Sequence, residues 1–178
     1  YFDHVILFID DATGPPPFAL RDHVVLISLS RRLRFSDWIH QSFARCTSGV
    51  SLLANSDIMF DSSIRHLCTI DGHSCFAAIS RYEGFDLALN PSLTQDAWAF
   101  VPSKAIINNK THLIHSSYIP LGYPGCENRM AAIAEEAGLR LINPCNHIFI
   151  HHVHRDQSRS YSETSRILGT YSFVHPGI

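Results

Sequence analysis

The chain has 178 residues, with 14 basic and 16 acidic side chains, so its net charge is −2 when histidine is neutral. Apolar residues make up 46% and charged residues 17%, which excludes a disordered chain and fits one domain over residues 1–178. A slightly acidic charge argues against a protein that coats nucleic acid. No apolar run approaches the roughly 20 residues that cross a bilayer, and the start lacks a signal-peptide pattern, so we expect no transmembrane segment.

Cysteine usage bears on the compartment. The five cysteines are an odd number at irregular spacing, and no two of them form a Cys-x-x-Cys pair. This pattern argues against a disulfide scaffold and against a structural zinc site. A reducing compartment follows as the expectation, and we therefore predict a cytoplasmic protein.

Apolar runs rich in β-branched residues predict seven buried strands. They cover residues 1–10, 24–29, 50–54, 74–80, 97–101, 139–142 and 148–153. Capping residues and apolar periodicity predict helices over residues 36–48, 61–68 and 127–137. Glycines and prolines make residues 102–124 irregular, and residues 155–178 form a C-terminal tail.

The order of these elements indicates the fold class. Strands that alternate with helices and read as continuous apolar runs are typical of a mostly parallel sheet covered on both faces. The sequence therefore predicts an α/β fold. Because ligands of such sheets bind beyond the carboxyl ends of the strands, the polar residues that follow each strand are the candidates for a site.

The strand at residues 50–54 runs into the polar turn Asn55-Ser56-Asp57. A carboxylate in this position suits Mg²⁺ or Mn²⁺, which bind oxygen and also recruit phosphate. In the alternative interpretation, Asp57 only closes a turn and Asp61 caps the next helix.

A cluster of histidines follows the last predicted strand. On a strand, His152 and His154 project to one face and His151 to the other. Imidazole is a good ligand for Mn²⁺ or Zn²⁺, although a histidine is often only structural. The sequence leaves both interpretations open.

Two more carboxylates and a basic cluster are candidates. Glu127 lies in the first turn of the helix at residues 127–137, as a general base or only as a charge that complements the helix dipole. Asp96 precedes a strand and either orients a substrate hydroxyl or closes a turn. Arg31, Arg32 and Arg34 precede the first helix, where they either meet a diphosphate or form a solvated basic face.

Several motifs in this order resemble GT-A-fold glycosyltransferase domains of bacteria and large DNA viruses, which act in surface-glycan synthesis. The motifs are at residues 34–38, 54–61, 79–83, 95–100, 122–129, 143–144 and 152–154. The resemblance implies a three-layer sandwich with a mostly parallel central sheet. The chain aligns from the second strand of that fold, which predicts that the first nucleotide-binding strand is missing.

The same resemblance implies a nucleotide-sugar donor, with a UDP-sugar as the first choice. Asn55, Ser56 and Asp57 take the place of the Asp-x-Asp motif of these enzymes, and Asn55 replaces its first carboxylate. Asp57, together with His152 or His154, would hold Mn²⁺ or Mg²⁺.

The implied reaction is transfer of the sugar to a hydroxyl of a carbohydrate acceptor, with inversion. Glu127 takes the place of the catalytic base, and Asp96, Arg34 and Arg81 would position the sugar or the diphosphate. The alternative is a non-catalytic carbohydrate- or nucleotide-binding module with a degenerate GT-A fold, which the asparagine at position 55 favours. A metal-dependent hydrolase built on the same residues is a third interpretation.

Overall fold

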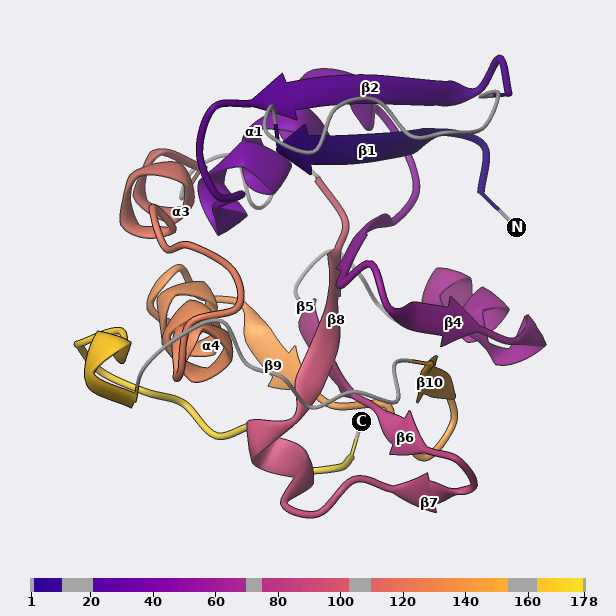
Figure 1. Cartoon of the computed structure of the whole chain (residues 1–178), viewed down its shortest axis with the longest axis vertical. Helices are drawn as coiled ribbons and strands as arrows, with labels where there is room; N and C mark the ends of the chain where they lie inside the picture. Colours follow the sequence, from indigo (N-terminus) through magenta and orange to yellow (C-terminus); the bar gives the residue numbers. More distant parts are fainter. Residues whose placement is uncertain (1, 11–20, 70–74, 103–109, 154–162, 178) are drawn as a thin grey trace.

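The structure, a computed structural model, describes residues 2–10, 21–69, 75–102, 110–153 and 163–177. The strands of these residues form three groups (Figure 1). A parallel pair contains β1 (Val5–Asp10) and β2 (Val24–Leu29). The central sheet contains, in spatial order, β3 (Ser51–Ala54), β8 (Gln95–Phe100), β5 (Cys75–Ser80) and β9 (Arg140–Ile142). The second sheet contains, in spatial order, β4 (Ile58–Phe60), β10 (Ile150–His152), β6 (Tyr82–Glu83) and β7 (Asp86–Leu87).

The described helices lie between and beside these strands. The α-helices are α1 (Phe35–Arg45), α3 (Lys110–Ser116) and α4 (Cys126–Glu136). The short 3₁₀-helices are Ser62–Thr69, Pro91–Leu93 and Glu163–Ser165. Asp37 closes the first turn of α1, because its Oδ2 accepts the backbone N–H of Arg34 at 2.9 Å. None of the described helices is both long enough and apolar enough to span a bilayer.

Strand direction in the central sheet differs from the prediction. β8 runs antiparallel to both of its neighbours, β3 and β5, and within this sheet only β5 and β9 are parallel. A parallel neighbour needs a crossover of a dozen or more residues, usually a helix. Residues 81–94, which connect β5 to β8, contain instead the β6–β7 hairpin and a 3₁₀-helix, so the chain returns in the opposite direction. The GT-A-like three-layer sandwich with a mostly parallel sheet is therefore wrong, and the fold is a small mixed α/β fold.

Burial on both faces explains why β8 reads as an apolar run. Its alternate residues enter two separate cores, since successive side chains of a strand point to opposite faces. Trp98 and Phe100 pack on the side of α1 and α4, and Phe35 meets Trp98 edge to face at 4.9 Å between ring centroids. Ala97 and Ala99 belong to the opposite core, which lies against the second sheet. An apolar run of this kind indicates burial on both faces. Because such burial occurs in mixed and in parallel sheets, the run does not report strand direction.

Other elements also depart from the prediction. The helix at residues 61–68 is a 3₁₀-helix, and α3 lies within a region predicted to be irregular. The first two strands are only partly buried, because they form an isolated pair. The end of the predicted tail is packed: Val174 is buried, and Asn143 and Gly177 exchange two backbone hydrogen bonds of 3.1 and 2.9 Å.

Candidate functional site

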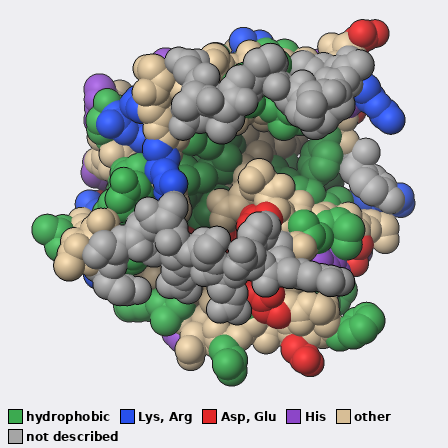
Figure 2. All heavy atoms as spheres, in the orientation of Figure 1, with side chains coloured by type: hydrophobic (Ala, Val, Ile, Leu, Met, Phe, Trp, Pro, Cys, Tyr) green, Lys and Arg blue, Asp and Glu red, His purple; other side chains and the backbone are tan. Residues whose placement is uncertain are grey.

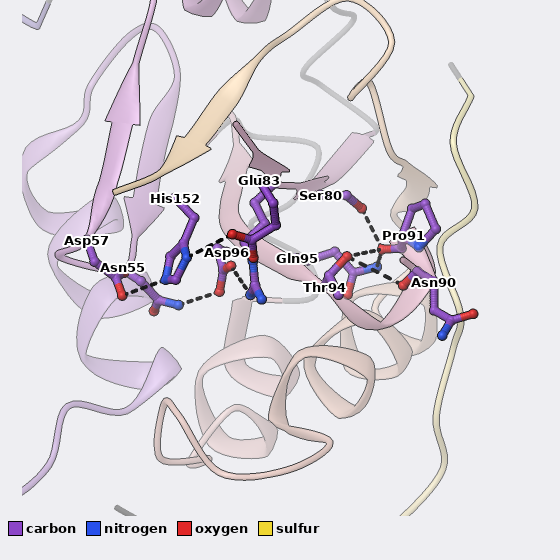
Figure 3. A network of polar contacts seen from close by, with 11 residues as sticks. Asn55, Asp57, Ser80, Glu83, Asn90, Pro91, Thr94, Gln95, Asp96 and His152 are labelled. Carbon is purple, nitrogen blue, oxygen red and sulfur yellow. Dashed lines mark hydrogen bonds and ion pairs between the residues drawn. The ribbon is translucent and has the colours of Figure 1, made fainter. Parts of the chain in front are cut away.

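Asp57 and His152 lie side by side although 95 positions separate them in the sequence (Figure 3). The pairing of β4 with β10 explains the contact, because it is antiparallel and places Ile58 opposite His152. The backbone N–H of Val153 also donates to the carbonyl oxygen of Asp57 at 2.9 Å. The register thus brings the start of β4 to the end of β10, and Nε2 of His152 is 3.0 Å from Oδ2 of Asp57.

Asp96 is the buried centre of the same region. Its Oδ1 accepts a 2.6 Å hydrogen bond from Nδ2 of Asn55, and its Oδ2 accepts one of 2.6 Å from Nη1 of Arg81. The first contact follows from the β3–β8 pairing, which continues into a 3.0 Å bond from the N–H of Asn55 to the carbonyl of Asp96. Only 7% of Asp96 is exposed. Burial raises the pKa of its carboxyl, and the positive charge of Arg81 opposes this rise.

Glu83 joins the two contacts into one network. Its Oε1 accepts a 2.7 Å hydrogen bond from Nε of Arg81, and its Oε2 is 3.3 Å from Nδ1 of His152. We call the resulting set the polar network, whose members are Asn55, Asp57, Arg81, Glu83, Asp96 and His152. Glu83 was not predicted as a site residue. The available signal was its position in the polar segment that follows β5, which also contains Arg81.

Glu127 lies in the first turn of α4 and is partly buried. Burial raises its pKa to about 7, and the negative charge of Asp96 adds to the rise. Its own backbone N–H and the guanidinium of Arg81 act in the opposite direction. Glu127 is therefore coupled electrostatically to the polar network, and its carboxyl titrates near neutral pH.

The remaining predicted site residues lie elsewhere. Arg34 is outside the polar network: its guanidinium carbon is 3.5 Å from the centroid of the Tyr118 ring. Ser56 is exposed in the turn between β3 and β4. His154 lies outside the described residues, so its predicted role as a ligand cannot be placed. The structure brings together Asn55, Asp57, Arg81, Asp96 and His152 from the predicted set.

Asp57 and His152 were also tested for their fit to a cation. Within the described ranges, no group of three or more His, Cys, Asp or Glu side chains is arranged to hold a metal ion. The 3.0 Å between Oδ2 and Nε2 matches two neighbouring ligands that are each about 2.1 Å from one ion. Mg²⁺ commonly takes one or two carboxylates and completes its shell with water and substrate phosphate, and imidazole suits Mn²⁺. The pair would supply two of the six ligands of such a site.

The face of the molecule shown in Figure 2 is hollowed below the β1–β2 pair. Asp and Glu side chains gather along the lower edge of this hollow, and Lys and Arg side chains lie along its left rim. Acidic and basic side chains are thus both exposed around this hollow.

The site was then set beside known proteins. No family model, no curated protein and no solved structure matches this chain.

Proposed function

We propose that the chain is a cation-dependent glycosyltransferase that moves a sugar from a nucleoside-diphosphate donor to a hydroxyl of a carbohydrate acceptor. One observation carries the proposal: Asp57 and His152 meet at 3.0 Å in the same network as the buried Asp96. Glu127, whose pKa is about 7, is coupled to that network. Carboxylate and imidazole ligands, with a base of near-neutral pKa coupled to the same network, would suit this reaction.

The donor side of the reaction needs positive charge on the departing diphosphate. Mn²⁺ or Mg²⁺ held by Asp57 and His152 would act there as a Lewis acid. Arg81 is committed to ion pairs with Asp96 and Glu83 at 2.6 and 2.7 Å, so its role is to hold these carboxylates in place. Asp96 retains lone pairs beyond its two hydrogen bonds and would accept a hydrogen bond from a sugar hydroxyl.

The acceptor side needs a base for the attacking hydroxyl. The acceptor oxygen forms a bond to the anomeric carbon while the bond from that carbon to the diphosphate oxygen breaks, and the diphosphate leaves with the electron pair. The hydroxyl proton passes to Glu127. A base is most effective when its pKa lies near the working pH, which the burial of Glu127 provides. A single displacement of this kind inverts the anomeric centre.

The test uses the purified chain with UDP- and GDP-sugars, Mn²⁺ and a set of saccharide acceptors. We expect release of nucleoside diphosphate that depends on Mn²⁺ and on an acceptor. Glu127→Gln should lower the rate by about 100-fold or more, as loss of a general base does. Glu135→Gln, an exposed glutamate of the same helix, is the matched control and should keep the rate. Near wild-type turnover in Glu127→Gln would remove the base from the mechanism.

One feature favours a second candidate, a module that binds a nucleotide or carbohydrate without turnover. The amide of Asn55 donates to Asp96 and offers no carboxylate, so the polar network presents a small ligand set. Calorimetry separates the two candidates. Binding of UDP or GDP in the presence of Mn²⁺ without any release of free sugar from the nucleotide sugars would favour the binding module.

A further inference from the structure

We infer that Glu83 is a positioning residue for His152: its carboxylate accepts a hydrogen bond from Nδ1–H of the imidazole and so turns the Nε2 lone pair toward Asp57. The inference rests on the cation site of the proposed function. Neither the sequence motifs nor the strand pattern gave Glu83 a role in that site. Glu83 itself would not touch the ion or the substrate.

The β6 strand places Glu83 beside His152. β6 is parallel to β10 with Tyr82 opposite His151, so the next residue on each strand is Glu83 and His152 respectively. The Tyr82 ring holds β6 in place, since it packs on the Phe149 ring at 5.3 Å between centroids.

The Glu83 carboxylate is itself held on its other side. Arg81 donates from Nε to Oε1 at 2.7 Å, which leaves Oε2 directed at Nδ1 of His152 at 3.3 Å (Figure 3). A ligand histidine usually donates its second N–H to a carboxylate or carbonyl, which sets the tautomer and the orientation of the ring. Glu83 meets this description.

The two neighbours of His152 make the tautomer important. Oε2 of Glu83 and Oδ2 of Asp57 are both acceptors, whereas a neutral imidazole carries one N–H. When that proton is on Nδ1, the Nε2 lone pair faces the Asp57 oxygen at 3.0 Å, and the two repel unless a positive charge lies near both. A cation held by His152 and Asp57 would provide that charge.

The polar network contains more acidic than basic side chains around His152. Asp57, Glu83 and Asp96 carry three carboxylates, and Arg81 supplies one guanidinium. Asp57 and Glu83 each contact one imidazole nitrogen of His152, at 3.0 and 3.3 Å. The Glu83 charge would strengthen His152 as a ligand across the ring.

The test measures Mn²⁺ binding by electron paramagnetic resonance, without nucleotide or acceptor. Glu83→Gln keeps the shape of the side chain and removes its charge, and we expect a 10- to 100-fold weaker affinity, about the loss seen when such outer partners are changed. Asp86→Asn is the matched control, because Asp86 is exposed and lies opposite Glu83 in the β6–β7 hairpin. It removes the same charge without contact to His152, and its affinity should stay within twofold of wild type.

A second measurement reads the tautomer in the unmodified protein. Long-range ¹H–¹⁵N spectra with bound Mg²⁺ should show Nδ1 of His152 protonated, with the signal assigned by its loss in His152→Gln. Protonation on Nε2 in that state would overturn the inference, as would equal Mn²⁺ affinity in wild type and Glu83→Gln, or no Mn²⁺ binding by wild type. A tenfold loss in Glu83→Gln without any sugar transfer by wild type would support the inference and refute the proposed transferase.

Discussion

Replacing Glu127 by glutamine should make the protein more stable at alkaline pH. Burial and the Asp96 charge raise the pKa of Glu127 from 4.5 to about 7. At about 1.4 kcal/mol per pKa unit, keeping this carboxylate ionised in the fold costs about 3 kcal/mol. Glutamine has nearly the same shape and stays neutral, so it should remove that cost.

The sign of the pH dependence follows from the direction of the shift. The folded protein holds the Glu127 proton more tightly than the unfolded chain, so the contribution to stability is complete below about pH 4.5. It is lost as the pH rises from 4.5 to about 7, and above pH 7 the full cost remains. Glu127→Gln and wild type should therefore be similarly stable at pH 4.5, and the variant should be more stable by about 3 kcal/mol at pH 8.

Urea unfolding followed by circular dichroism at pH 4.5, 6 and 8 measures this difference. The difference between the two proteins should grow with pH, while Glu135→Gln, an exposed change on the same helix, should give a small difference that does not vary. Parallel stability curves for wild type and Glu127→Gln would show that the carboxyl is not destabilised by its surroundings. Its assignment as a near-neutral base would then fail as well, whatever the substrate.

Two further variants test the buried polar contacts. Asp96→Asn removes the negative partner of the Arg81 guanidinium, which is 2.6 Å away and partly buried, and should cost about 2 kcal/mol in urea unfolding; an unchanged midpoint would show that the pair is not needed for the fold. Asn143→Ala removes side-chain bonds to Ser80 Oγ (2.7 Å) and to the carbonyl of Val174 (3.0 Å). This variant should lose about 2 kcal/mol of unfolding free energy, and its C-terminal segment should become sensitive to protease. An unaltered digestion pattern would show that Asn143 does not hold this segment in place.

The sequence predicted much of the site because buried strands end where polar residues begin. Asn55 and Asp57 follow β3, Arg81 follows β5, and His152 ends β10, so the polar residues at strand ends were found without knowing which strands pair. The positions of β3, β5, β8, β9 and β10 were predicted because an unbroken apolar run is readable in one sequence. The short strands β4, β6 and β7 leave no such run and were not predicted.

Strand direction and pairing could not be predicted in the same way. Two-sided burial gives the same apolar run in β8 whether its neighbours are parallel or antiparallel. Arg34 was assigned by local charge, but its packing on Tyr118 depends on a contact 84 positions away, which a local pattern does not report. Glu83 was missed because its contact with His152 arises only through the pairing of β6 with β10.

The polar network therefore depends on the register in which β4 pairs with β10, and it does not need the parallel strand order that was expected. Antiparallel pairing brings the start of β4 to the end of β10, and this places Asp57 against His152. A shift of one residue in that pairing would exchange the two faces of β10. His151, which now lies 3.9 Å from Asp61 and 3.3 Å from the carbonyl of Gly84, would then point toward Asp57 instead. In the observed register, the β6–β10 pairing also places the Glu83 carboxylate 3.3 Å from Nδ1 of His152.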